Sequence, residues 1–429
     1  MNSAAWPADG FLKIQKHRMP RRTSPHLGSD KIRAVFGEHD AKTLGQLEDV
    51  ASRAEMVALM ADGHVGYVMP IGGVAAYRKK VSVVGVGFDI ACGNAAIRTD
   101  LVLEDIEGRL PELADEIAGA ISFGVGRKNS ARDAPTDHPL FESDAWDLIP
   151  VREERKTLRK KARDQLGTVG SGNHYVDVFA DERGRIWVGV HFGSRGFGHT
   201  VATGFLNMSQ GFEWTARGTK EAEVLLPLGG ALGHDYWHLM NLAGEYAYAG
   251  REWVARKVVE ILGGQEEELI HNHHNFAWME EHEGEKFVVV RKGATPAWPG
   301  QKGFVGGSMG DDAIIIQGSS EDSDQQKAAL YSTVHGAGRV MSRREAAGKR
   351  NWKTGKILVP GKVSPEMMHA WLAEKGVILR GGGLDESPHA YRRLPEVVTA
   401  QGATIDVLHT LQPLIVVMAG ANEFDPYKD

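Results

Sequence analysis

Hydrophobic positions along the chain follow two periods, one typical of strands and one typical of a long helix. From residue 235 to residue 262, apolar side chains recur near the 3.6-residue period, and Gly263-Gly264 ends the run, which predicts a core-packed helix. Short apolar runs predict strands over residues 78–86, 185–192, 286–292 and 313–318. No internal repeat is found. The pattern favours one large α+β domain over 1–429, with mixed β-sheets and flanking helices.

Two long polar segments, 127–143 and 291–312, are too rich in glycine, proline and charge to predict regular elements. Loops of this length in a compact domain are often binding loops. The second segment contains Arg291, Lys292 and a glycine run that ends at Ser308, and its main-chain amides are suited to a phosphate. An ordinary surface loop is the alternative.

Charge and cysteine content limit the class of protein. The net charge of −6 argues against indiscriminate coating of nucleic acid, although the segments 155–163 and 343–356 are locally basic. The one cysteine, Cys92, cannot form a disulfide within the chain, which favours the cytoplasm. The first 22 residues lack the pattern of a secretory signal, and no apolar run is long enough to span a bilayer. We therefore expect a cytoplasmic protein without a membrane segment.

Five side chains that can bind a metal stand at the ends of apolar runs, namely Asp89, Cys92, His174, His191 and His274. The aspartate and the cysteine are three positions apart, so both can reach one cation, or the thiolate can bridge two. By ligand softness this set suggests zinc, iron or cobalt before manganese. A single histidine is more often structural, but the joint pattern predicts a metal site.

The remaining histidines need separate interpretations. His234 and His238 form an i,i+4 pair without the glutamate of a metalloprotease motif, which indicates helix surface or packing. His271 and His273 flank the candidate ligand His274, and consecutive side chains point in different directions, so we expect only one of the three in the site.

A histidine of another kind lies in the stretch STVHGAGRVMSR, residues 332–343. In this stretch His335 directly precedes a glycine loop that ends at Arg339. A mobile glycine loop lets an imidazole approach an electrophile, and histidine is one of the side chains that form covalent intermediates. We therefore predict a metal site beside a nucleophile.

Several motifs together carry a resemblance to a known family. They are DGHVGY and PIGG within 62–73, GVGFDIACG (85–93), GSGNH (170–174), HFGSRG (191–196), HHN (273–275), RKGA (291–294), GSMG (307–310) and HGAGRVMSR (335–343). Dispersed through most of the chain in one order, they resemble the RtcB family of GTP-dependent RNA-splicing ligases. Members of that family join RNA 3'-phosphate or 2',3'-cyclic phosphate ends to 5'-hydroxyl ends, in tRNA splicing or RNA repair.

The resemblance implies a role for individual residues. Cys92 would bridge two Mn²⁺ ions, with His174 on one ion and Asp89, His191 and His274 on the other. His335 matches the histidine that is guanylylated by GTP. Phosphates would be held by Asn173 and by Arg195 or Arg339, and the other nucleotide-binding positions are Asp177, Ser308, Gly336, Gly338 and Tyr391. The implied partners are GTP, RNA with the ends named above, and an archease-like activator, with no membrane.

The chain also departs from the family pattern. Ala419 stands where a lysine that helps to hold the guanine nucleotide is usual, Asp177 replaces a glutamate, and residues 421–429 form a short C-terminal extension. Two alternatives therefore stay open. One is a metal-dependent phosphoesterase, in which a metal-bound hydroxide attacks. The other is a non-catalytic relative that binds GTP or RNA.

Overall fold

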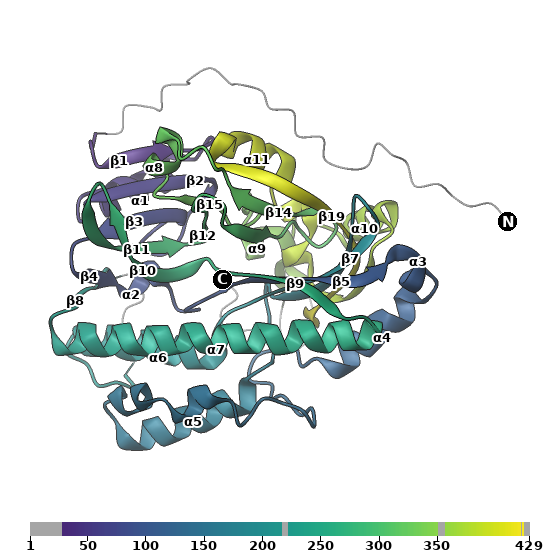
Figure 1. The fold of residues 1–429 in the computed structure, drawn as a ribbon, viewed down its shortest axis with the longest axis horizontal. Helices are drawn as coiled ribbons and strands as arrows, with labels where there is room; N and C mark the ends of the chain where they lie inside the picture. The colour runs from purple at the N-terminus through teal and green to yellow at the C-terminus, as the bar shows by residue number, and fades with distance from the viewer. Residues whose placement is uncertain (1–27, 217–221, 351–356, 422, 424–429) are drawn as a thin grey trace.

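Two β-sheets and one long helix organise the computed structural model, which describes residues 28–216, 222–350, 357–421 and 423 (Figure 1). The first sheet has the strand order β1-β2-β3-β11-β10 and consists of β1 (Ile32–Val35), β2 (Met56–His64), β3 (Ile71–Tyr77), β11 (Glu285–Lys292) and β10 (Asn275–His282). The second has the order β13-β14-β19-β6-β7-β5-β9, with β18 beside β19. Its strands are β13 (Lys302–Val305), β14 (Ala313–Gly318), β19 (Ile405–Gly420), β6 (Tyr175–Asp181), β7 (Arg185–Phe192), β5 (Gly93–Val102), β9 (Glu266–His273) and β18 (Ile378–Gly382).

Short strand pairs and helices complete the architecture. The pairs are β4 (Lys80–Ser82) with β8 (Leu225–Pro227), β12 (Ala294–Pro296) with β15 (Ser332–Val334), and β16 (Gly348–Arg350) with β17 (Ile357–Pro360). The α-helices are α1 (Ala41–Ala51), α2 (Val83–Val86), α3 (Leu103–Ile106), α4 (Leu110–Ala120), α5 (Arg152–Gln165), α6 (Arg195–Ser209), α7 (Ala231–Leu262), α8 (Asp324–Ala328), α9 (Arg343–Ala347), α10 (Pro365–Lys375) and α11 (Leu394–Gln401). The expected α+β class with mixed sheets is confirmed.

Helix α7 runs along both sheets and joins their hydrophobic cores (Figure 1). Residues of its first half, such as Tyr236 and Tyr246, pack with side chains of the first sheet, including Val288. Residues of its second half, such as Val254, pack with Val188 of the second sheet. The helix ends as predicted, because Gly263 takes the left-handed conformation with a φ of 83° that favours glycine.

Most predicted elements are confirmed, and two are wrong in part. The strands expected at 185–192, 286–292 and 313–318 correspond to β7, β11 and β14. The run 78–86 is a strand only to Ser82, whose hydroxyl accepts a hydrogen bond from the Gly85 N–H at 2.8 Å and starts the helical turn α2. The segment 291–312 is not all loop, because β12 and β13 form within it by pairing with strands elsewhere in the chain.

The expectations for the polar segment 127–143, the two termini and the basic segment 343–356 remain to be compared with the structure. The segment 127–143 is free of strands and α-helices, as expected, and contains only a 3-10 turn at Pro139–Glu142. The N-terminal 22 residues, most of the 421–429 extension and the end of the basic segment 343–356 lie outside the described residues. Among those that are described, no helix is long and apolar enough to cross a bilayer.

The antiparallel register of the second sheet brings four strand ends to one edge. Gly93 at the start of β5 pairs with Phe192 at the end of β7 and with His273 at the end of β9, while Tyr175 at the start of β6 pairs with His191. The residues that flank these ends therefore converge. A single residue, His274, separates β9 of the second sheet from β10 of the first, so this edge is also the junction between the sheets.

Close backbone approach at this edge leads to a first prediction, for Gly93→Ala. A Cβ at Gly93 would lie 2.1 Å from the main-chain oxygen of Asn272, so β5 and β9 must separate. We expect this overpacking to cost about 1–3 kcal/mol of unfolding free energy, measured by urea denaturation. Gly119→Ala in α4 is the control, because its Cβ would meet no atom within 4 Å, and alanine there is expected to be neutral or stabilising. Equal midpoints for both variants would contradict the prediction.

Candidate functional site

Side chains from four segments meet at the junction of the two sheets. The Sγ of Cys92 lies 3.3 Å from the Nε2 of His191 and 3.6 Å from the Nε2 of His174. The Nε2 atoms of His191 and His274 are 3.1 Å apart. Four of the five ligands proposed from the sequence are buried, and the fifth, Asp89, is half-buried beside them. A cysteine and three histidines whose ligand atoms converge in this way are typical of a metal site.

The donor atoms form two groups that share the cysteine. One group is Cys92, His191 and His274, and the other is Asp89, Cys92 and His174. In the second group the Oδ2 of Asp89 lies 3.1 Å from the Nε2 of His174. Asp89 therefore lies with His174, whereas the resemblance had assigned it to the ion of His191 and His274. The reason is local, because a turn of the chain between Asp89 and Cys92 carries the carboxylate to the β6 side of the thiol.

Each ligating imidazole is oriented through its other nitrogen. The Nδ1 of His174 donates to the main-chain oxygen of Val169 at 2.9 Å, and that of His191 donates to the main-chain oxygen of Asn173 at 2.9 Å. The Nδ1 of His274 lies 3.2 Å from the side-chain oxygen of Asn275. Because a proton on Nδ1 leaves a lone pair on Nε2, all three rings present an acceptor atom to the shared cysteine and its neighbours.

Burial favours the uncharged forms of Cys92, His191 and His274 when no cation is present. Burial raises the pKa of the Cys92 thiol well above its usual value, and the nearby Asp89 charge raises it further. Burial also lowers the pKa of His191 to about 3 and holds that of His274 well below its usual value. Neutral imidazoles are ready to bind a metal, whereas the thiol must first lose a proton. A set of cysteine, histidine and aspartate fits a first-row transition metal ion.

His335 lies directly beside the metal-ligand group and is held by a buried carboxylate. Its ring centre is 4.8 Å from that of His274. The Nδ1 of His335 donates to the Oδ2 of Asp62 at 2.6 Å, and the main-chain N–H groups of His335 and Gly336 donate to the same oxygen at 2.9 and 3.2 Å. These hydrogen bonds fix the loop and leave the Nε2 of His335 with its lone pair.

Asp62 is a functional residue that the sequence reasoning missed. Burial opposes its ionisation, but the electrostatic interaction with His335 and the hydrogen bonds that His335 donates outweigh that effect and hold the pKa of Asp62 below its usual range. The signal for it was the DGHVGY motif, which had been noted without assigning a role to its aspartate. The partner is 273 residues away, and only the fold of β2 against the loop after β15 brings the two together.

The glycines after His335 form a loop that lies against Asp62. The main-chain N–H of Gly336 is one of its donors, and Gly338 has a φ of 73°. A Cβ at Gly338 would lie 2.4 Å from the main-chain oxygen of Asp62. Only glycine therefore fits at this position of the loop. The two candidate glycines therefore shape the loop that carries His335.

The two arginines proposed as phosphate ligands have different surroundings. Arg195 lies at the metal-ligand group, with its Nη1 at 3.5 Å from the Nδ1 of His174. Arg339 lies against Tyr391, with its Nη1 at 2.8 Å from the hydroxyl and its guanidinium 4.9 Å from the ring centre. It also forms an ion pair with the buried Glu386 at 3.1 Å. Protein partners thus take the donors of Arg339, and Arg195 is the arginine beside the ligands.

The other proposed nucleotide ligands lie on the β6 side. Asn173 is exposed and precedes the ligand His174. Asp177 is buried, and its Oδ1 has no hydrogen-bond partner among the described residues. Burial raises the pKa of Asp177 well above its usual value. The hydroxyl of Ser308 donates to Asp311. Asp177 is therefore a buried carboxyl that protein contacts leave unsatisfied.

The histidines flanking the ligand behave as expected. Only His274 of the HNHH tract joins a metal-ligand group, while His271 and His273 contact the buried Arg251 at 3.2 and 2.8 Å. His234 and His238 lie together on α7 with a ring separation of 4.4 Å and belong to neither group.

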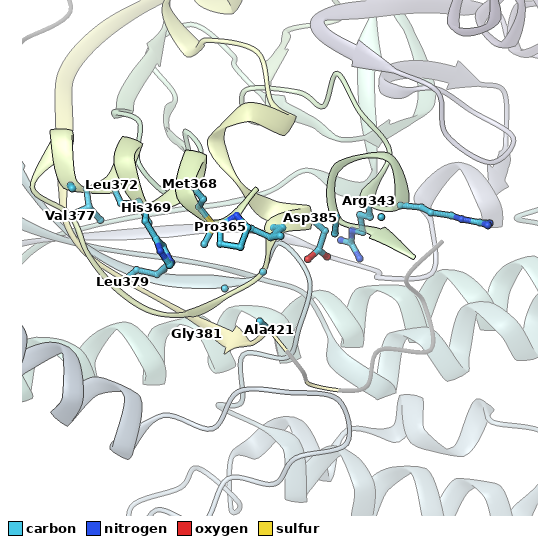
Figure 2. Close-up of a pocket in the computed structure, with 17 residues that line it drawn as sticks. Arg343, Pro365, Met368, His369, Leu372, Val377, Leu379, Gly381, Asp385 and Ala421 are labelled. Carbon is cyan, nitrogen blue, oxygen red and sulfur yellow. The ribbon is translucent and has the colours of Figure 1, made fainter. Parts of the chain in front are cut away.

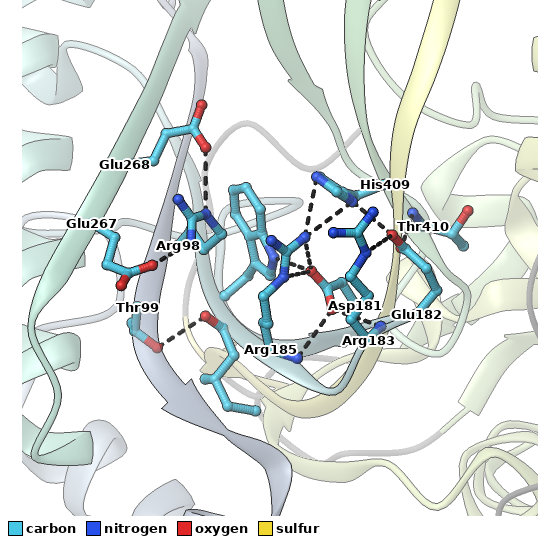
Figure 3. A network of polar contacts seen from close by, with 12 residues as sticks. Arg98, Thr99, Asp181, Glu182, Arg183, Arg185, Glu267, Glu268, His409 and Thr410 are labelled. Atoms are coloured by element: carbon cyan, nitrogen blue, oxygen red, sulfur yellow. Dashed lines mark hydrogen bonds and ion pairs between the residues drawn. The ribbon is translucent and has the colours of Figure 1, made fainter.

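A further acidic cluster does not suit a cation. Asp181, Glu182 and His409 lie close enough to hold a metal, but the guanidinium of Arg185 stands among them (Figure 3). The Oδ2 of Asp181 already accepts from Arg185 at 2.7 Å and from the indole of Trp187 at 3.1 Å. This cluster is a structural ion-pair network on the far end of β6 and β7.

A surface hollow of about 730 Å³ lies between α9, α10 and β18 (Figure 2). Arg343 and Asp385 line one end and Leu372 and His369 the other. None of the metal-ligating residues lines this hollow. Arg343 connects it to the centre, because a Cβ at Gly172, two positions before His174, would lie 2.8 Å from its guanidinium.

Comparison with known proteins gives consistent matches over most of the chain. Residues 44–419 match the family model described as tRNA-splicing ligase RtcB. The tRNA-splicing ligase RtcB of Archaeoglobus fulgidus is 33% identical, over 82% of this chain and 83% of the relative. The RNA-splicing ligase RtcB of Escherichia coli K12 is 29% identical, over 84% of this chain and 89% of the relative. The RNA-splicing ligase RtcB homolog 1 of Entamoeba dispar is 31% identical, over 87% of this chain and 81% of the relative.

The raised pKa of Cys92 predicts proton release when a metal ion binds. The thiol is protonated at pH 7 in the metal-free protein, and a metal requires the thiolate, so affinity should rise by up to about tenfold per pH unit below that pKa. A Mn²⁺ titration in weakly buffered solution with a pH indicator should release close to one proton more per chain from the wild type than from Cys92→Ala, because only the wild type has the thiol proton to lose. Metal binding at full affinity without proton release would contradict the assignment.

Proposed function

The chain belongs to the RtcB family, and from this premise we propose that it is a GTP- and Mn²⁺-dependent RNA ligase. It joins RNA 3'-phosphate or 2',3'-cyclic phosphate ends to 5'-hydroxyl ends through a GMP-histidine intermediate on His335, in tRNA splicing or RNA repair. The observation that carries the proposal is the Asp62–His335 pair beside the metal-ligand group. A buried carboxylate that holds one nitrogen of an imidazole leaves the other free to attack.

The proposed first step uses this arrangement directly. The Nε2 lone pair of His335 attacks the α-phosphorus of GTP, a P–N bond forms, and pyrophosphate leaves. Positive charge then develops on the imidazole, and Asp62, which contacts Nδ1 at 2.6 Å, stabilises it. Asp62 is already ionised before the reaction, because its pKa lies below the usual range despite its burial.

Two further transfers complete the proposed reaction. An oxygen of the RNA 3'-phosphate attacks the phosphorus of GMP, the P–N bond breaks, and the RNA end becomes activated. The 5'-hydroxyl of the second RNA end loses its proton and attacks the 3'-phosphate, and GMP leaves. Cys92 with His191 and His274, and Cys92 with Asp89 and His174, would hold two Mn²⁺ ions, which would supply positive charge for the phosphoryl oxygens. Arg195 adds a fixed cation beside His174.

The nucleotide pocket is proposed on the β6 side of the centre. Asp177 supports a contact to guanine, because a buried carboxyl without a protein partner is costly unless a ligand satisfies it. Tyr391, Ser308 and Asn173 are the further proposed contacts. Ala419 lacks the cation that the family pattern offers at this position, so recognition of guanine depends more on Asp177.

The wider context belongs to the same proposal. One catalytic domain spans 1–429, with residues 421–429 as a short extension, and an archease-like protein acts as activator. The lone cysteine supports a cytoplasmic location, because a catalytic thiolate must stay reduced. The phosphoesterase alternative retains the metal ligands but gives His335 no covalent role, and a non-catalytic binder has no use for an oriented nucleophile.

Guanylylation tests the proposal. The protein is incubated with GTP labelled at the α-phosphate and with Mn²⁺, and label on the chain is measured after denaturing electrophoresis. We expect acid-labile label on the wild type and none on His335→Ala. His238→Ala is the control, because that residue is exposed on α7 away from the site, and its label should equal the wild type. Label that persists on His335→Ala would place the intermediate elsewhere, and turnover of RNA ends without any label would favour the phosphoesterase.

The role of Asp62 gives a separate prediction for Asp62→Asn. The amide keeps the size of the side chain but cannot stabilise a charged imidazole as a carboxylate does, and it can hold the wrong tautomer. We expect adduct formation to slow by about 10²-fold or more in single-turnover assays. Mn²⁺ affinity should stay close to the wild type, because Asp62 belongs to neither metal-ligand group. An adduct that forms at the wild-type rate would remove Asp62 from the mechanism.

A further inference from the structure

A fully buried arginine lies beneath the metal-ligand groups. Arg251 stands in the middle of α7 with no exposed surface, where the helix passes from one hydrophobic core to the other. Burial lowers the pKa of Arg251 to about 10, although the charges of Asp89 and Glu252 act in the opposite direction. A buried charge is expensive, and its retention requires compensating hydrogen bonds.

The hydrogen bonds of this guanidinium end on the backbone next to the metal ligands. Its Nη1 donates to the main-chain oxygen of Ala91 at 2.9 Å and to that of Phe192 at 2.6 Å. Ala91 directly precedes Cys92, and Phe192 directly follows His191. One nitrogen therefore joins the segment that enters β5 to the end of β7, each time at the residue next to a ligand, and the Sγ of Cys92 and the Nε2 of His191 are 3.3 Å apart.

The guanidinium is itself held in place by aromatic side chains. Its Nε donates to the Nε2 of His271 at 3.2 Å, and its Nη2 lies 2.8 Å from the Nδ1 of His273. The ring of Tyr248 stacks on that of His273 with a centre distance of 3.8 Å, and the guanidinium lies 5.3 Å from the centre of the tyrosine ring. The arginine is thus fixed in orientation as well as in position.

We propose that Arg251 is a positioning residue of the metal centre, which holds the carbonyls of Ala91 and Phe192 and so sets the distance between the ligand atoms of Cys92 and His191. The inference rests on the proposed metal-dependent function and names a residue that contacts neither metal nor substrate. Ala91 needs such a tether, because its φ of 61° lies in the left-handed region that non-glycine residues rarely adopt.

Cobalt(II) binding tests the proposal without using activity. Cys92 is the only cysteine, so a thiolate-to-cobalt absorption band in the near ultraviolet reports on this one ligand. For Arg251→Lys and Arg251→Met we expect affinity for Co²⁺ to fall about 10- to 100-fold, and the band to weaken or shift. Lysine keeps the charge but lacks the Nε and Nη2 groups that contact His271 and His273 and fix the orientation, and methionine removes every donor. Arg256→Lys, on the exposed side of the same helix, should match the wild type.

The outcomes separate this inference from the proposed function. Circular dichroism of the metal-free proteins first establishes which variants fold. If Arg251→Lys does not fold, Arg251→Met is used for the metal titration, because an apolar side chain often replaces a buried charge without loss of stability. Folded Arg251 variants with wild-type affinity and spectrum would overturn the inference alone. If neither variant folds, Arg251 serves the fold as such and the inference is also overturned. A wild type without a thiolate band would overturn the metal centre and the proposed function with it.

Discussion

The structure depends on main-chain hydrogen bonds that tie Cys92 to the turn between the two sheets. The carbonyl oxygen of Cys92 accepts from the N–H groups of His274 and Asn275 at 2.8 and 3.2 Å, and the N–H of Ala91 donates back to the oxygen of Asn275 at 2.7 Å. Because His274 is the single residue between β9 and β10, these bonds fix the second sheet against the first. The same bonds bring the thiol of Cys92 beside His274. The hydrogen bonds that join the two sheets therefore also bring these two ligands together.

Much of this arrangement was predictable from the sequence, and what was missed has a physical cause. Residue types and strand ends pointed to Cys92, His174 and His191, because alternation along a strand fixes which side chains share a face. The structure places the carboxylate of Asp89 with His174, whereas the resemblance had assigned it to the ion of His191 and His274, and spacing alone does not decide between these arrangements. Asp62 and Arg251 were missed, because their partners lie far along the chain and only tertiary packing brings them together.

Two of the seven non-glycine residues with a positive φ in the described part of the chain lie beside the metal-ligand groups. Ala91 and Arg195 have φ values of 61° and 55°, and each lies next to or near a ligand, at Cys92 and His191 respectively. Such conformations persist only where the surroundings over-determine them. Here the surroundings are the bonds of Cys92 to the sheet junction and those of Arg251 to Ala91. Rigid strands therefore present the ligands, and these hydrogen bonds hold the strained residue Ala91 in place next to Cys92.

The HNHH tract, residues 271–274 at the end of β9, contributes both to the metal-ligand groups and to the surroundings of Arg251. His271 and His273 are two positions apart and face α7, where they hold Arg251, while His274 follows on the other side and faces Cys92. Asn272, between them, accepts from the N–H of Phe304 at 3.1 Å and secures the strand beside β13. Three adjacent histidines are therefore not interchangeable ligands. One belongs to a metal-ligand group, and the other two fix the arginine that positions the remainder of that group.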